Sequence, residues 1–244
     1  MKRLVLAGSL AMLAFGAFAD EINAEEVHYI TPVEIDFASP LQLPFTCPAS
    51  TWRVWGVRLD LPFGRSHYVY GIDAGVSGYI STEMYGLQGS CVNWVNGDVA
   101  GIQAGVLGNT IRGDVAGIQG AGILNLDSGY MAGIQAALCN FDGAFYGIQA
   151  GALNWVGGIS YGGQLAVSNI NVNEFTGASF GLVNISSRAR GLQVGFVNEI
   201  EEAGEGVQIG VFNGAKEFNG VQIGLFNVIQ NAPLPIMAFV NVNF

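Results

Sequence analysis

Four glutamates in one short segment come nearest to the spacing of a metal site. They are Glu199, Glu201, Glu202 and Glu205. Carboxylate oxygens are the ligands that Ca²⁺ prefers, so this segment could bind a divalent cation. A solvated acidic turn between two strands accounts for the same spacing, and it is the interpretation that we favour. We therefore expect no metal here.

The cysteines and histidines offer no second candidate. The chain has three cysteines and two histidines, which are Cys47, Cys91, Cys139, His28 and His67. The cysteines have no CxxC or other ligand spacing, and neither histidine has the neighbours of a catalytic triad. Strand alternation places Cys91 and Cys139 on opposite faces, so we expect packing thiols rather than a disulfide between them. We expect the histidines to be solvated or strand residues.

Glycine motifs and three aromatic residues are the remaining candidates for a functional site. Segments such as GVSG and GAG lack the strand-to-helix setting and the lysine of a phosphate-binding loop. Trp94, Phe141 and Trp155 each follow an asparagine of the repeat described below. They could stack on a ligand, but an aromatic belt at a membrane interface explains their shared position better. We expect no enzyme activity, no catalytic residue and no cofactor.

The low content of charged residues and the negative net charge limit the kinds of partner that this protein can bind. The formal net charge is −10, only 11% of the residues are charged, and the mean hydropathy is +0.40. A soluble surface is typically about 25% charged, so we expect something other than water to cover much of this protein. Nucleic acid is excluded as a partner, because binding a phosphate backbone requires clustered Lys and Arg.

The first residues have the pattern of an export signal. Met1, Lys2 and Arg3 precede an apolar stretch that ends at Ala17-Phe18-Ala19. A cationic start, an apolar middle and small residues two apart are typical of a cleaved secretory signal. The alternative of a membrane anchor requires about 20 apolar residues, more than this stretch provides. We predict a signal peptide over 1–19, an N-terminal segment with one candidate strand over 20–50, and a repeat β-domain over 51–244.

An eight-residue unit, Gly-apolar-Gln-x-Gly-x-x-Asn, recurs along most of the chain. Clean copies begin at Gly86, Gly147, Gly191, Gly206 and Gly220. Blurred copies begin at six further glycines, which are Gly71, Gly101, Gly117, Gly133, Gly162 and Gly177. Successive starts are 14 to 16 residues apart. Such a regular period indicates a tandem structural repeat.

Residues alternate within each unit. In the copy at Gly206, Val207, Ile209 and Val211 form one face, while Gln208 and Gly210 belong to the other. A period of two indicates a β-strand. Between units lie dipeptides such as Asn96-Gly97, which favour two-residue hairpins. We therefore predict antiparallel neighbours, with each Gln opposite a small residue, and bulges in the copies at Gly101 and Gly117.

Further strands extend this sheet at both ends. The segments Trp52–Phe63 and His67–Tyr79 predict a hairpin around Gly64-Arg65, and 26–37 predicts another strand. The last residues alternate up to Phe244, as the final strand of an outer-membrane barrel commonly does. A continuous apolar face with two open edges is not tolerated in water. We therefore predict an all-β antiparallel meander of about 12–14 strands, closed as an outer-membrane β-barrel. A parallel β-solenoid with stacked Gln and Asn is the alternative.

The tandem GxQxGxxN units, the lead-in VRLDLPFGRSHYVYGIDAGV from Val57 and the ending PLPIMAFVNVNF resemble a family of bacterial surface-repeat proteins. The resemblance covers about Trp52 to Phe244. It departs from the pattern at Asp73, which replaces Gln, at Ala137, which replaces the second Gly, and in the units at Gly162 and Gly177. The family implies placement in the outer membrane or at the cell surface, and no established chemistry.

These observations predict a non-enzymatic repeat protein of the outer membrane or cell surface, as a porin-like or structural barrel. The expected partners are outer-membrane lipid and, through the C-terminal strand, the barrel-insertion machinery. The alternative is a secreted, surface-attached solenoid that binds a partner as an adhesin does. Dependence on detergent would separate these two classes.

Overall fold

The computed structural model describes residues 29–38, 41–43 and 52–244, and all of their regular secondary structure is β-strand. The all-β prediction is therefore confirmed. No helix in these ranges is long and apolar enough to cross a membrane. The expected signal peptide, His28 and Cys47 lie outside the described residues. The chain divides after Gly133 into two compact units.

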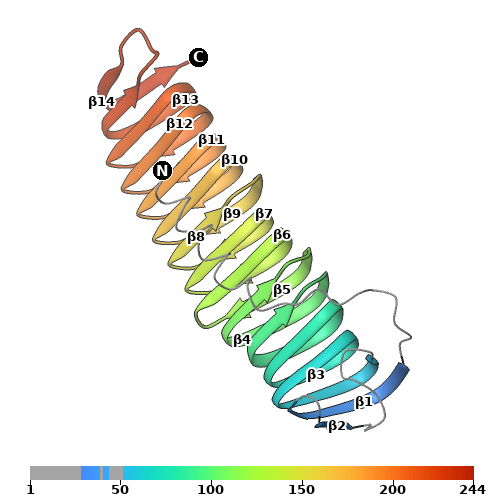
Figure 1. The fold of residues 1–244 in the computed structure, drawn as a ribbon. Helices are drawn as coiled ribbons and strands as arrows, with labels where there is room; N and C mark the ends of the chain where they lie inside the picture. The colour runs from blue at the N-terminus through green and yellow to red at the C-terminus, as the bar shows by residue number, and fades with distance from the viewer. Residues whose placement is uncertain (1–28, 39–40, 44–51) are drawn as a thin grey trace. The chain divides into compact units, whose positions relative to one another are not determined.

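Unit 1 consists of the described residues up to Gly133. Its strands are β1 (Tyr29–Ala38), β2 (Leu41–Leu43), β3 (Trp52–Val95), β4 (Val99–Ile111), β5 (Val115–Ala121) and the first part of β6 (Leu124–Ala136). Strand β3 is long because it bends through several turns of the chain without losing its hydrogen-bonded ladder (Figure 1).

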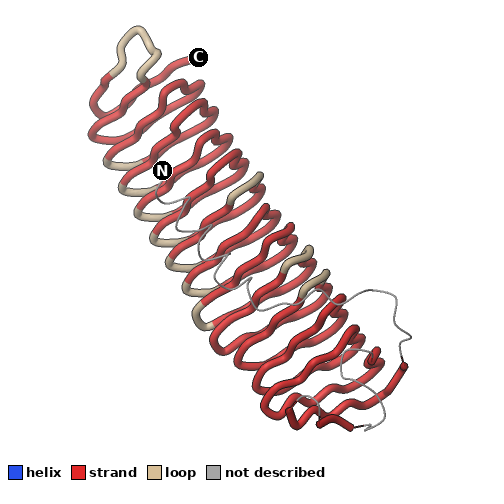
Figure 2. The backbone as a smooth tube through the Cα atoms, in the orientation of Figure 1, coloured by secondary structure: helices blue, strands red, loops and turns tan. Residues whose placement is uncertain are grey.

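Unit 2 runs from Ile134 to Phe244. After the end of β6 its strands are β7 (Cys139–Ala150), β8 (Leu153–Val156), β9 (Ser160–Leu165), β10 (Ser168–Phe180), β11 (Val183–Val194), β12 (Val197–Ile209), β13 (Phe212–Ile229) and β14 (Ile236–Asn243). Figure 2 shows that only short turns separate most of these strands.

Successive repeats pair in parallel and in register, so each unit is a parallel β-solenoid. Gln193 of β11 lies beside Gln208 of β12, and Asn184 lies beside Asn198. Strands β12 and β13 continue the same register. One repeat is therefore one coil: a glutamine-bearing strand, a turn, an asparagine-bearing strand and a second turn.

The antiparallel meander and the barrel built from it are wrong. The prediction placed Gln88 opposite Gly105, but Gln88 pairs with Gln103. The dipeptide Asn96-Gly97 forms a corner where the chain continues into the next coil, because the Asn96 amide donates to the carbonyl of Ile80. The solenoid alternative is confirmed. The bulge predicted in the copy at Gly101 is present as a register shift opposite Ser90 and Val92.

The repeat glycine is required by the stacking of the coils. Gly177 has φ 144°, a backbone conformation that side chains other than glycine rarely adopt. A Cβ atom at this position would lie 1.9 Å from the carbonyl oxygen of Gly162 in the preceding coil. The coils can therefore stack this closely only if glycine occupies this position.

Side-chain amides fill the interior of the coils. The Nδ2 atom of Asn184 donates to Oδ1 of Asn198 at 2.8 Å and to the carbonyl of Val194 at 3.0 Å. Gln222 donates in the same way to Gln208, and Gln208 to Gln193. A buried amide is tolerated when it is hydrogen-bonded, and an identical residue in the next coil supplies a partner.

The apolar face of the repeat points outward, and the glutamine face lines the interior of the coil. Gln208 is 1% exposed, whereas Ile209 beside it is 38% exposed. In the last coils of unit 2, a small apolar cluster is also buried, and it consists of Phe175, Ala189, Ile200, Ala215, Phe218 and Ile229. The coil encloses little space, so it holds flat amides and few large side chains.

The ends of the chain also differ from the prediction. The segment predicted as a strand over 26–37 forms β1, but β1 lies parallel to β3, with Glu34 beside Arg58. The hairpin around Gly64-Arg65 is wrong, because the coils from Gly56 and Gly71 stack in the same direction: the position of a Cβ on Gly71 is 2.1 Å from the Gly56 carbonyl oxygen. The predicted C-terminal strand is present as β14, which pairs antiparallel with β13.

Candidate interaction surface

Unit 2 carries a row of exposed apolar side chains along one edge. These residues lie at or beside the turn that joins the glutamine strand of each coil to the asparagine strand, and Figure 2 shows these turns, in tan, lined up along that edge. We call them the apolar ridge; they are 42–60% exposed, and the row comprises Leu138, Val167, Leu182, Phe196, Phe212, Leu225 and Phe226.

Aromatic contacts order one end of the apolar ridge. The rings of Phe212 and Phe226 stack with centroids 5.0 Å apart, and Phe196 meets Phe212 edge-on at 5.9 Å. In-register parallel strands place equivalent side chains about 4.8 Å apart, which is the spacing that lets rings stack. The ridge is therefore a fixed row rather than a set of independent side chains.

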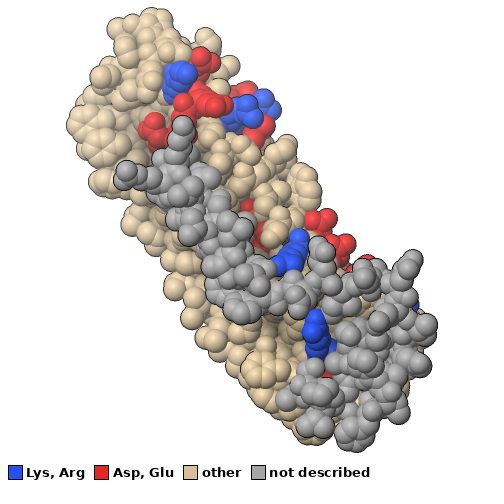
Figure 3. All heavy atoms as spheres, in the orientation of Figure 1, with Lys and Arg blue, Asp and Glu red and all other residues tan. Residues whose placement is uncertain are grey.

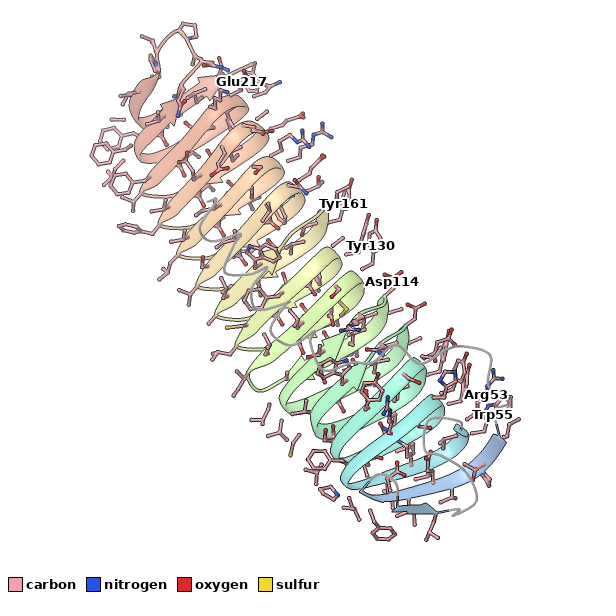
Figure 4. All side chains as sticks on the ribbon, viewed as in Figure 1. Arg53, Trp55, Asp114, Tyr130, Tyr161 and Glu217 are labelled. Carbon is pink, nitrogen blue, oxygen red and sulfur yellow. The ribbon has the colours of Figure 1, made fainter. Side chains whose placement is uncertain are left out.

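Charged residues gather at the opposite turns of the same coils. We call them the charged edge; it comprises Arg188, Arg190, Glu201, Glu202, Glu205, Lys216 and Glu217. Figure 4 shows Tyr161 and Glu217 projecting from this side of unit 2, and in Figure 3 the opposite outline of the unit is free of charged atoms. One turn of each coil thus carries the apolar ridge, and the opposite turn carries the charged edge.

The charged edge forms loose ion pairs. Arg188 lies 3.9 Å from Glu202, and Arg190 lies 3.7 Å from Glu174 and 4.0 Å from Glu205. Exposed pairs of this length contribute little to stability. They surround a hollow of about 390 Å³ over Ala189, Ala203 and Gly204.

Three of the four glutamates considered as a calcium site, Glu201, Glu202 and Glu205, lie on this edge, whereas Glu199 lines a separate hollow with Phe212 and Phe226. Burial, then the charge of Glu201, raises the pKa of Glu199, while Glu202 and Glu205 lie near arginines. The described residues contain no group of three or more His, Cys, Asp or Glu side chains arranged to hold a metal ion. The acidic segment lies within β12, whose register against β13 shifts between Ile200 and Ala203, and it is not the tip of a hairpin.

The other residues that the sequence offered as candidates for a functional site do not form one site. His67 is a buried strand residue whose Nδ1 contacts the hydroxyls of Ser81 at 2.6 Å and Thr82 at 3.0 Å. Cys91 and Cys139 are free thiols. Phe141 and Trp155 are neighbours on β7 and β8, with ring centroids 6.1 Å apart and ring planes tilted by 45°, and Trp155 is buried.

Sequence reasoning missed a buried charge cluster in unit 1. Arg58 donates to both carboxylate oxygens of Asp73 at 2.8 and 2.9 Å and to Asp60 at 2.9 Å. Gln88 also donates to Asp73, while Glu34 pairs with Arg58 across β1 and β3. The glutamine ladder thus continues as alternating charges. The replacement of Gln by Asp73 in the repeat was the one signal of this cluster.

Carboxylates outnumber cations in the cluster. Glu34, Asp36 and Asp60 are almost fully buried, and each has one oxygen without a hydrogen-bond partner. Burial, then the charge of Asp36, raises the pKa of Glu34 to about 8, and burial raises the pKa of Asp60 to about 9. Burial also raises the pKa of Asp36 to about 6, against the opposing charge of Arg58. Glu34 and Asp60 therefore hold protons in the folded state at neutral pH, whereas Asp36 holds one only at mildly acidic pH.

We expect unit 1 to lose stability as the pH rises from about 4 to about 9. The folded chain keeps protons that the unfolded chain releases near pH 4, so stability falls across this window by up to about 1.4 kcal/mol per pH unit for each proton involved. Urea midpoints measured at pH 5 and pH 8.5 test this. Asp60→Asn removes one titrating group while keeping the acceptor for Arg58, so it flattens the dependence; an unchanged slope in this variant would contradict the assignment.

No protein-family model, curated protein or solved structure matches this chain. The resemblance to bacterial surface-repeat proteins stays a prediction.

Proposed function

We propose that this chain is an exported, non-enzymatic protein of the bacterial cell envelope that binds a partner along its apolar ridge. The observation that supports the proposal is the ridge itself. Seven large apolar side chains remain exposed in one row. A large contiguous patch of exposed apolar side chains commonly marks an interaction site. The resemblance to surface-repeat proteins is consistent with this placement.

The interior of the coil explains why the ridge stays outside. The turn residue Gly181 donates its amide to the carbonyl of Val194, and Leu182 donates to Val167. Asn184, two residues on, is held by Asn169, Ser179 and Asn198. Turning Leu182 inward would break these buried hydrogen bonds, each of which costs about 1–3 kcal/mol to leave unmade.

Covering the ridge supplies enough free energy for binding. Burying a fully exposed Leu, Val or Phe side chain contributes roughly 1.5–3 kcal/mol. The ridge residues are about half exposed, so each contributes roughly 1 kcal/mol when a partner covers it. The row acts as a unit because the coils fix its spacing.

A barrel-type pore is not part of this proposal, because the strands close each coil on itself. The barrel-insertion machinery loses its basis as a partner for the same reason. What remains from the sequence is the surface-attached solenoid.

Cell fractionation of two paired variants tests the proposal. The variant Leu182→Asp/Phe196→Asp places two negative charges in the ridge. The control Glu201→Gln/Glu217→Gln removes two negative charges from the charged edge. We expect the wild type and the control to sediment with the envelope. The ridge variant should appear mainly in the soluble or secreted fraction, with unchanged circular dichroism. Retention of the folded ridge variant at the wild-type level would overturn the proposal.

A further inference from the structure

The apolar ridge fits one kind of partner better than others, and the inference that follows rests on the proposed function. We propose that the ridge binds the surface of a phospholipid bilayer, inserting its turn residues among the lipid chains while the charged edge stays in water. The solenoid would then lie on the membrane rather than span it.

The shape of the ridge supports a lipid partner. The ridge lies where each coil reverses direction, so it is only one or two residues wide per coil, and neighbouring coils follow at about 4.8 Å. A rigid protein surface meets such a convex row along a narrow line, whereas a stable protein interface buries about 800 Å² on each partner. A fluid bilayer deforms around the row and covers both of its sides.

The surface beside the ridge extends the same chemistry. On the adjoining glutamine strands, the outward positions nearest the turn hold Leu165, Phe180, Ile209 and Ile223, all at least 38% exposed. Side chains of this type are expected at the depth where acyl chains begin, with the polar face of the structure outward. These residues lie on the flank of the ridge, where lipid that has closed around the row would cover them and a flat protein surface that touches the ridge would not.

The distribution of charge decides which lipid surface is favoured. The ridge contains no Lys or Arg, and the cations of unit 2 lie on the charged edge. Attachment to anionic lipids normally depends on clustered basic residues and weakens with salt. A chain of net charge −10 gains nothing from an anionic surface. The ridge should therefore bind zwitterionic phospholipid, and salt should not weaken the binding.

Vesicle flotation tests this directly. The full chain is mixed with phosphatidylcholine vesicles at low and at high salt, and the floated fraction is measured. We expect flotation at both salt concentrations and an at least tenfold loss of apparent affinity for Leu182→Asp/Phe196→Asp. The control Glu201→Gln/Glu217→Gln should float as the wild type does.

Other outcomes separate the failure of this inference from failure of the proposed function. Envelope retention that depends on the ridge, together with no flotation, would overturn the lipid partner and leave a protein partner for the same ridge. A dimer in lipid-free solution that Leu182→Asp/Phe196→Asp dissociates would also overturn it, because a second copy would cover the ridge. Flotation only with anionic vesicles at low salt would contradict the salt-independent mode.

Discussion

Replacing Gly177 with alanine should cost about 3 kcal/mol or more of unfolding free energy. The residue has φ 144°, and its Cβ would lie 1.9 Å from the carbonyl oxygen of Gly162. Side chains in this backbone region cost about 1–3 kcal/mol, and forcing extra volume into a packed contact costs about as much again. The contact is with backbone, which cannot rotate away. Urea or guanidinium unfolding of the full chain measures the loss.

Gly163→Ala is the matched control in the same unit. A Cβ at Gly163 meets no atom within 4 Å, so we expect a change of less than about 1 kcal/mol, in either direction. Equal losses in the two variants would show that the stacking of repeat glycines does not set the spacing of the coils.

Replacing Arg58 with methionine should cost about 3–5 kcal/mol, because it leaves buried carboxylates without their counter-charge. Arg58 is fully buried, and its guanidinium donates to Asp60, to Asp73 and to the carbonyl of Tyr79. The loss should be smaller at pH 5 than at pH 8.5, because protonation of the carboxyl groups removes the uncompensated charge. Denaturant unfolding at the two pH values measures both effects.

Two further variants test whether the loss of stability comes from the buried charge. Arg188→Met removes an exposed guanidinium whose nearest acid, Glu202, is also exposed, so it should cost less than about 1 kcal/mol. Adding Asp73→Asn to Arg58→Met removes one of the stranded charges and should recover part of the stability. If the double variant is as unstable as the single one, the loss comes from packing and not from charge.

The buried charges distinguish the first coils of unit 1 from the coils that follow them. Repeat glycines and amide ladders are identical from coil to coil, so they would permit any coil to stack on any other. The charges at Arg58 and Asp73 differ from the amides that follow them, and Glu34 and Arg58 match only in one register. Buried polar groups can specify register in this way, and we infer that this cluster fixes β1 on the first coils of unit 1.

The sequence by itself determined the local structure of this protein. The spacing of 14 to 16 residues between repeat glycines, the alternation around Gln208 and the turn residues at Asn96-Gly97 were sufficient to predict β-strands and one bend in each repeat. They did not predict the second turn of each coil, which separates the glutamine strand from the asparagine strand. These features are local, because strand alternation and turn chemistry depend on neighbouring residues.

Only the tertiary structure decided how the strands pair and which face is enclosed. Alternation shows that Gln208 and Ile209 lie on different faces, but it is the same for a barrel, a meander and a solenoid. The parallel register gives each buried amide a partner in the next coil, as Asn184 has in Asn198, and this removes the usual cost of enclosing polar groups. The pairing of Glu34 with Arg58 joins residues that lie off the repeat period, so no spacing in the sequence marked it. The narrow interior is already filled by amides that hydrogen-bond to one another. The apolar residues therefore form the outer surface.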